Sequence, residues 1–443
     1  MQLSKRNTIL VTMKNERYIL GLLAIVLLSS CGSDKNPTPT TNDVTKPNIL
    51  LIIADDMGKD ATFGFTEGSI KPNTPNINAI KNAGLTFSNV WVNPTCSPTR
   101  ASIITGKYGY RTGVKWAGDV LPTTETILHK YISEQTNNAY ATAIVGKWHL
   151  SGVSNTVNPE SFGMDYYAGI ASGAVPDYYN WTLSEDGSTS NQTQYATEFL
   201  TNLAINWVES QDKPWFLWLA YNAPHTPFHV PPSEMHSQGE LPAYSAGLDA
   251  VPYYMAAIEA MDYQIGRLIS SIPANELENT IILFIGDNGT PNQVAQKPYS
   301  NQTVKGTIFQ GGINTPMFIS GKGVTRTGTD NNLISSTDLF TTIANLAGAR
   351  VTERFDSKSF ATLLTTPDSI RKYQYSEMDD GTRDAWTISN GSFKLIVDVS
   401  GNEQMYNLLE DPYEEKDLLL GSLTSSQAVA KNELENELGK IRQ

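Results

Sequence analysis

Acidic and amide side chains follow two apolar runs in this sequence, at the points where the runs stop. Asp55 and Asp56 come directly after the run 49–54, and Asp287 and Asn288 end the run in "TIILFIGDNGT". These positions offer three carboxylates and one amide, oxygen donors that suit Ca²⁺ or Mg²⁺ better than zinc or copper. A divalent cation would also relieve the repulsion between adjacent carboxylates. The set predicts a cation site, against the ordinary alternative of a helix cap at Asp56 and a turn at "GDNG".

Basic residues and histidines follow two further apolar runs. "AYATAIVGKWHL" ends at Lys147 and His149, and "PWFLWLAYNAPHTP" leads into His225. Singly, such lysines are ordinary solvated loop residues. Continuous hydrophobicity, with helical patterns at 198–209 and 253–272, predicts parallel strands covered on both faces by helices. Ligands bind such sheets beyond the carboxyl ends of the strands, so we expect all these side chains to meet at one edge.

Cys96 lies in "TCSPTRASIITGK", just before a predicted helix. Ser97 suits the cap, Pro98 the first helical position and Gly106 the end. Backbone N–H groups at that positive helix end favour an anion on a nucleophile or on the oxyanion that it attacks, and Arg100 can reach the same place. The alternative is a buried, inert thiol that packs as a small hydrophobe.

The other cysteine of the chain, Cys31, ends the apolar run "YILGLLAIVLLSSC". The run follows Lys14 and Arg17 and is too short to span a bilayer, which is typical of a secretory signal. Its last four residues resemble the bacterial lipobox, in which the cysteine is acylated and becomes the first residue of the mature chain. An ordinary signal peptide with an incidental cysteine is the alternative.

We therefore expect a lipoprotein signal peptide over 1–30 and a flexible tether over 31–46, where Pro, Thr, Asn and Asp dominate. The protein is then exported and lipid-anchored in the bacterial envelope, in the periplasm or on the outer-membrane surface. A lipidated Cys31 leaves Cys96 without a disulfide partner in the chain, which favours a chemical role for Cys96.

Composition excludes one class of partner. The chain has 45 acidic and 32 basic residues, a formal charge of -13, so we expect no nucleic-acid binding. An anionic substrate must instead be attracted by a local positive pocket.

The segment "CSPTR", followed by "ASIITG", resembles the signature C-x-P-S/T-R of the type I sulfatases, whose cysteine is oxidised to formylglycine. Other segments match the family's landmarks in order, between about residue 47 and residue 420: "NILLIIADDMG", "GKWHL", "NAPHTPF", "GDNG", "KGTIFQGGINTP", "STDLFTTIANLAGA" and "YNLLEDPYEEKDL". Ordered matches along a chain are more specific than one short motif. The sequence departs from the family at Gln310 and Asn314, where Glu and Arg are more usual, and at Thr99, where Ser is. We interpret the first two as the joint replacement of an ion pair; the third bears on recognition by the maturation enzyme.

The resemblance implies an alkaline-phosphatase-like α/β fold, a mixed and mostly parallel sheet between helices. We expect a sulfatase catalytic domain over 47–350 and a smaller C-terminal α+β subdomain over 351–443. In the latter, "AWTISNGSFKLIVDVSGNEQMYNLLEDP" predicts a small antiparallel sheet and "SSQAVAKNELENELGKI" a closing helix.

The resemblance also implies roles for the site residues. One hydroxyl of the hydrated formylglycine at Cys96 would attack sulfur, and the second would later lose its proton and expel sulfate. Ca²⁺ would be held by Asp55, Asp56, Asp287, Asn288 and the modified Cys96. The sulfate would be neutralised by Arg100, Lys147 and Lys305. His149 would be the base and His225 the acid. We expect His229 and His236 to be ordinary residues of a Pro-rich loop, and His129 to be structural.

Three functions remain open at this stage. The first is a sulfatase acting on a carbohydrate or polysaccharide, matured by a formylglycine-generating or anaerobic enzyme. The second is a phosphodiester or phosphonate monoester hydrolase of the same superfamily. The third is a lipoprotein that binds sulfated glycans without catalysis, which would need neither a nucleophile nor a base.

Overall fold

The structure, a computed structural model, describes residues 46–443. The predicted signal peptide, Cys31 and nearly all of the predicted tether lie outside the described residues. Within the described part of the chain, no helix is long and apolar enough to cross a membrane.

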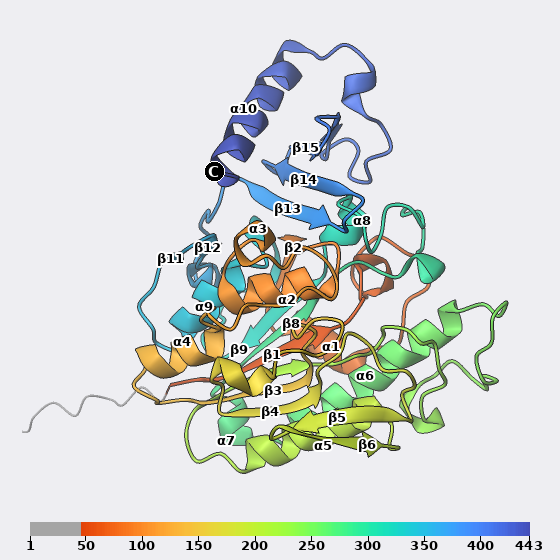
Figure 1. Ribbon diagram of the computed structural model, residues 1–443, viewed down its shortest axis with the longest axis vertical. Coiled ribbons are helices and arrows are strands. Elements are labelled where there is room, and N and C mark those ends of the chain that lie inside the picture. The colour runs from red at the N-terminus through yellow and green to blue at the C-terminus, as the bar shows by residue number, and fades with distance from the viewer. Residues whose placement is uncertain (1–45) are drawn as a thin grey trace, which may run out of the picture. The chain divides into compact units, whose positions relative to one another are not determined.

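A mixed sheet of ten strands forms the centre of the fold, in the order β10-β2-β9-β8-β1-β7-β3-β4-β5-β6 (Figure 1). Its strands are β1 (Asn48–Ala54), β2 (Leu85–Trp91), β3 (Ala141–Lys147), β4 (Tyr166–Ile170), β5 (Trp181–Glu185), β6 (Ser188–Gln192), β7 (Trp215–Ala220), β8 (Thr280–Gly286), β9 (Met317–Gly321) and β10 (Gly328–Ser335). β9 runs antiparallel to β8 and β2, and β5 is antiparallel to β4 and β6. The predicted mixed, mostly parallel sheet is confirmed.

The four strands predicted from the apolar runs are neighbours in the middle of this sheet. β8, β1, β7 and β3 follow one another in that order and are all parallel. Every residue of the four is buried, which explains why their sequences are continuously apolar. Their carboxyl ends lie at one edge of the sheet, as the sequence predicts.

Helices cover both faces of the sheet (Figure 1). Side chains of α2 (Cys96–Thr105), α4 (Leu128–Gln135) and α9 (Asp338–Leu346) pack on one face, in a cluster with Ile49, Leu51 and Ile53 of β1. Those of α1 (Pro75–Asn82), α5 (Ala196–Glu209) and α6 (Val251–Ser271) pack on the other, with Leu50 and Ile52. Short helices are α3 (Gly109–Thr112), α7 (Ala274–Leu277) and α8 (Gln310–Ile313). This alternation is the period of two expected of a strand buried on both faces.

The C-terminal part has the predicted small antiparallel sheet and closing helix. The strands are β13 (Gln374–Asp379), β14 (Asp384–Ser389), β15 (Phe393–Asp398) and β16 (Glu403–Asn407), paired in chain order. The helix α10 (Ser425–Ile441) begins in a capping box at Thr424 and buries Leu434 and Leu438 against this sheet. A two-stranded ribbon, β11 (Glu353–Arg354) and β12 (Ser357–Lys358), precedes them. The boundary at 350/351 stays a prediction.

A buried ion pair joins the C-terminal sheet to the loop before α8. Lys394 of β15 lies 2.5 Å from Glu414, and neither side chain is exposed by more than 1%. The same Lys394 Nζ donates to the carbonyl of Ile308 at 2.6 Å, and Glu414 accepts from the backbone N–H of Gln310. The segment 308–310 is therefore held by residues far downstream in the sequence.

The start of α2 differs from the sequence prediction. The helix begins at Cys96, with Thr95 as the extended N-cap residue, so Ser97 and Pro98 lie inside its first turn. Ser97 does not cap because its hydroxyl donates to the carbonyl of His149 at 2.8 Å and accepts from the N–H of Gly118 at 3.0 Å. The predicted end at Gly106 is confirmed, with a left-handed φ of 72°.

Candidate active site

The predicted acidic residues meet at the carboxyl ends of β1 and β8. Asp55, Asp56, Asp287 and Asn288 are all buried, with at most 1% of any of them exposed. Asp287 N donates to the carbonyl of Ala54 at 3.0 Å, and Asp56 N donates to Asp287 Oδ1 at 3.0 Å. Asn288 Nδ2 donates to Asp56 Oδ1 at 2.8 Å. Backbone bonds at the strand ends thus fix three carboxylates in one small volume.

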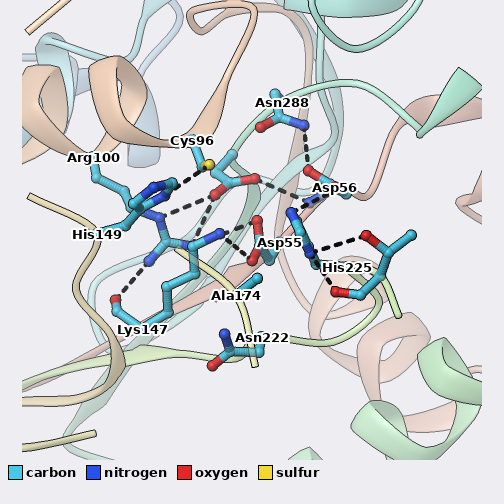
Figure 2. Close-up of polar contacts among 12 residues, drawn as sticks. Asp55, Asp56, Cys96, Arg100, Lys147, His149, Ala174, Asn222, His225 and Asn288 are labelled. Atoms are coloured by element: carbon cyan, nitrogen blue, oxygen red, sulfur yellow. Dashed lines mark hydrogen bonds and ion pairs between the residues drawn. The ribbon is translucent and has the colours of Figure 1, made fainter. Parts of the chain in front are cut away.

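Each of these carboxylates is paired with one of the predicted cations, and Figure 2 labels Asp55, Asp56, Arg100 and Lys147 among the residues of the site. The pairs are Lys147 Nζ with Asp55 Oδ2 at 2.5 Å, Lys305 Nζ with Asp56 Oδ2 at 2.6 Å, and Arg100 with Asp287 Oδ2 through Nε at 3.1 Å and an Nη at 2.8 Å. The other Nη of Arg100 donates to the carbonyl of Lys147 at 2.7 Å. The site therefore contains three basic and three acidic side chains.

Lys305 reaches the cluster from a loop between β8 and β9, and not from a strand end. Its N–H donates to the carbonyl of Thr290 at 3.2 Å, and that of Gly306 donates to the carbonyl of Pro94 at 2.9 Å. The second bond ties the lysine to the segment just before Cys96. The lysine side chain keeps 23% of its surface exposed, in contrast to Lys147, which is fully buried.

Cys96 and His149 lie together at the start of α2. Cys96 Sγ is 3.1 Å from His149 Nδ1, and Cys96 is only 2% exposed. Burial, followed by the charges of Lys147 and Arg100, lowers the pKa of His149 well below its usual range, so His149 is neutral. Burial raises the pKa of the Cys96 thiol, which outweighs the opposing charge of Lys147. An unmodified Cys96 is therefore a protonated thiol and a weak nucleophile.

His225 faces the cluster from the loop after β7. Its Nε2 lies 3.8 Å from Asp56 Oδ2, and its Nδ1 lies 2.6 Å from the carbonyl of Thr226, which requires a proton on Nδ1. Burial lowers the pKa of His225 to about 4; Asp56 opposes this shift, and Lys305 adds to it. In this arrangement Nε2 is the nitrogen that remains for a ligand.

The acidic residues fit a calcium ion. Asp55 Oδ1 and Asn288 Oδ1 are buried and have no hydrogen-bond donor among residues 46–443. Ligand atoms of Asp55, Cys96 and Asp287 lie within 4.8 Å of one another, and so do those of Asp55, Asp56 and His225. Buried oxygens without a donor are costly, and a hard cation satisfies them.

Burial and neighbouring charges give the two aspartates that follow β1 different pKa values. It raises the pKa of Asp55 to about 8, and Lys147 only partly opposes this shift. Burial also acts on Asp56, but the charges of Lys305, His225 and Lys147 prevail and hold its pKa at about 2. A cation beside Asp55 would therefore stabilise the carboxylate whose charge is least compensated.

The remaining histidines lie outside the charged cluster. His129 is fully buried in α4 and its Nε2 lies 3.2 Å from the carbonyl of Ala143, in agreement with the predicted structural role. His229 stacks on Tyr178 with ring centroids 3.7 Å apart, and its Nε2 lies 3.1 Å from the hydroxyl of Tyr195. His236 follows a short 3-10 helix in the same Pro-rich loop.

Gln310 and Asn314 interact, as expected of a replaced ion pair. Asn314 Nδ2 donates to Gln310 Oε1 at 2.8 Å, and Asn314 Oδ1 accepts from the N–H of Val90 at 3.2 Å. The amide pair thus links α8 to the end of β2 without a charge. Thr99 bonds both the N–H and the carbonyl of Asn93, at 2.9 Å and 3.2 Å.

One polar residue at this edge of the sheet is not among the residues predicted from the sequence. Asn222 follows β7, three residues before His225, and is 2% exposed. Its position in "YNAPHTP", three residues before His225, is the one feature of the sequence that indicates a place in the site.

A sequence model of the sulfatase family matches residues 47–349, well over half of the chain. The chain belongs to the sulfatase family. It is 30% identical over 376 residues to the uncharacterised sulfatase YdeN of Escherichia coli, a match that covers 71% of this chain and 65% of that protein. It is 24% identical over 431 residues to an ulvan-active sulfatase of Formosa agariphila, which covers 90% of this chain and 82% of the relative. The match to YdeN thus spans just under two thirds of its length.

The crystal structure of Ps i-CgsB in complex with k-i-k-neocarrahexaose has the same fold. It superposes with a TM-score of 0.75 at 27% identity, over 89% of this chain and 92% of that chain. The alkaline-phosphatase-like fold implied by the sequence resemblance is confirmed.

Replacing Asp287 by Ala should abolish calcium binding, because it removes one carboxylate and releases Arg100 into the cluster. Elemental analysis of purified protein should find calcium in the unaltered chain and none in Asp287→Ala. Added calcium should raise the melting temperature of the unaltered protein and leave that of Asp287→Ala unchanged.

Asp338→Ala is the matched control for this prediction. Asp338 is an equally buried carboxylate, paired with Arg371 at the start of α9, so its loss should lower stability and leave the calcium content unchanged. Zinc in place of calcium in the unaltered protein, or full calcium in Asp287→Ala, would contradict the assignment.

Proposed function

We propose that this member of the sulfatase family is a sulfuric ester hydrolase that releases sulfate from a carbohydrate, with formylglycine made from Cys96 as its nucleophile. One observation carries the proposal: Cys96 and a neutral His149 lie against three cations that are each matched to a buried carboxylate. With a divalent cation bound, such a site would have a net positive charge and could attract an anion to a protein whose net charge is -13. The carbohydrate is supported by the neocarrahexaose bound to Ps i-CgsB and by the ulvan-active sulfatase of Formosa agariphila.

Two groups would complete this site. Formylglycine at position 96 would supply an aldehyde hydrate as the nucleophile, and Ca²⁺ held by the acidic cluster would polarise the sulfate. His149 Nδ1, 3.1 Å from Sγ, is placed to accept the proton of a hydroxyl carried at that position. Because the pKa of His149 lies well below its usual range, the ring is in the form that accepts a proton at neutral pH.

Arg100, Lys147 and Lys305 would bind the sulfate and stabilise the charge that builds on its oxygens. Their carboxylate partners hold the three cations in place before substrate arrives, so little reorganisation is needed during reaction. Arg100 also fixes the end of β3 through the carbonyl of Lys147. Lys305, the more exposed lysine, is the one nearer to solvent and to an entering substrate.

His225 would protonate the leaving oxygen. Its Nδ1 is occupied by the carbonyl of Thr226, so Nε2 is the atom that can give a proton. Burial and Lys305 lower the pKa of this ring, and the negative charge of a bound sulfate ester acts in the opposite direction. Binding of the substrate therefore favours the protonated form that an acid requires.

The sulfatase proposal predicts sulfate release without comparable phosphate release from a panel of sulfated and phosphorylated sugars. Mass spectrometry should find formylglycine at position 96 when the protein is made with a maturation enzyme, and Cys96→Ala should release no sulfate. Phosphodiester or phosphonate hydrolysis as the faster reaction would establish the second hypothesis instead. Tight binding of sulfated glycans without any turnover by the matured protein would establish the third.

Replacing His225 by Ala should damage hydrolysis of a sugar sulfate far more than that of nitrophenyl sulfate, because a sugar alkoxide needs a proton to leave and a nitrophenolate does not. General acid catalysis is worth about 10²- to 10⁴-fold where it is needed. The measurement is the ratio of the two losses in kcat/KM. Lys305→Ala is the control, since a residue that holds the sulfate should affect both substrates alike. Equal losses in His225→Ala would show that another residue is the acid.

We also propose that lipid on Cys31 holds the enzyme in the bacterial envelope. The proposal rests on the lipobox-like segment at 28–31 and the polar stretch after it. The unaltered protein should partition with membranes and carry acyl chains by mass spectrometry, and Cys31→Ser should do neither. A wholly soluble, unacylated protein in the native cell would refute the anchor.

A further inference from the structure

Asn222 lies beside Asp55 at the edge of the sheet that carries the site. β7 lies between β1 and β3, and its register pairs Ala220 with Ile53. The pairing continues past the strand ends, because Tyr221 N donates to the carbonyl of Ile53 at 3.0 Å and Asp55 N donates to the carbonyl of Ala223 at 3.2 Å. Asn222 is thus the residue of the β7 segment that comes level with Asp55.

The side chain of Asn222 is expected on the same face of the sheet as Cys96. Phe216, Trp218 and Ala220 of β7 pack in one cluster with Ile49, Leu51 and Ile53 of β1. Side chains of α2 belong to the same cluster. Tyr221 packs in the opposite cluster, so the alternation holds through that residue. By the same alternation, Asn222 follows Ala220 and Asp55 follows Ile53 on this face of the sheet. The close-up of the site draws Asn222 with Ala174 and Lys147, and no dashed line reaches its amide (Figure 2).

The amide of Asn222 has no structural use. Asn222 is 2% exposed, and neither Nδ2 nor Oδ1 has a hydrogen-bond partner among residues 46–443. The main chain, in contrast, is well bonded: its carbonyl accepts from the Tyr178 hydroxyl at 2.8 Å and from the N–H of His225 at 2.9 Å. The turn is therefore held by the backbone, and burial of a side-chain amide with no partner costs stability.

The charges of the site favour a neutral donor at this position. Three cations already match three carboxylates, and a further lysine or arginine would disturb that balance. An amide adds a hydrogen bond to an anion without adding charge.

We propose that Asn222 is a further substrate-binding residue, whose Nδ2 donates a hydrogen bond to the sulfate group. The proposal rests on the proposed sulfatase function and extends it to a residue outside the set suggested by the sequence.

The test uses Asn222→Leu, a substitution of similar size without polar atoms, in the matured full-length protein. The inhibition constant of inorganic sulfate and the KM of a sulfate ester should both rise, by about 10- to 100-fold for a lost hydrogen bond to a charged group. The melting temperature of the free protein should stay the same or rise, because an unpartnered amide has been removed. Asn222→Asp, which keeps the shape and loses the donor, should weaken sulfate binding at least as much.

Two controls separate substrate binding from support of the His225 loop. Trp215→Phe removes another buried N–H without a partner, at the opposite end of β7, and should leave sulfate inhibition unchanged. A sulfate-binding residue should also lower hydrolysis of nitrophenyl sulfate and sugar sulfate equally, whereas displacement of His225 would affect the sugar sulfate more.

Unchanged sulfate inhibition in both Asn222 variants would overturn the inference and leave the sulfatase function standing. A lower melting temperature together with a selective loss on the sugar sulfate would also overturn it, since Asn222 would then be a residue that supports the loop. An unaltered, matured protein that neither binds sulfate nor releases it would overturn the proposed function and this inference with it.

Discussion

Charge matching at one edge of the sheet is the constraint on which the rest of the site depends. Three carboxylates with almost no exposure would repel one another strongly in a medium of low dielectric constant. Lys147, Lys305 and Arg100 come from three different segments to offset them. The fold must therefore bring strand ends, the N-terminal half of α2 and a long loop to the same point before the site is stable.

This constraint explains why the most informative parts of the sequence were the ends of the apolar runs. The four central strands are buried on both faces, so their sequences are continuously apolar and each end is marked by an abrupt change to polar residues. Parallel strands place such ends together, and Asp55, Asp56, Asp287, Asn288 and Lys147 accordingly meet as predicted. The small C-terminal sheet could also be predicted, because apolar and polar residues alternate in its strands and its turns contain Gly and Asn.

Other features depend on contacts that local sequence does not contain. The start of α2 was misplaced because Ser97 is an excellent capping residue in isolation, yet its hydroxyl is used by Gly118 and His149. The link between Lys305 and the segment before Cys96 is a backbone bond between distant loops. The sequence does not single out Asn222, because an Asn two residues before a proline is an ordinary turn residue, and only its burial without a partner distinguishes it.

The ion pair between Lys394 and Glu414 affects the order in which parts of the chain can fold during synthesis. Its partners hold the segment 308–310, a few residues beyond Lys305, and both are synthesised long after Cys96 and the four central strands. On the ribosome, α2 and most of the large sheet emerge before the residues that hold this loop. Cys96 is 2% exposed in the folded protein, so the proposed maturation enzyme would have to reach its sulfur before folding is complete. If Cys96 is modified as proposed, the late synthesis of residues 394 and 414 leaves an interval between the emergence of Cys96 and the anchoring of the loop that follows Lys305.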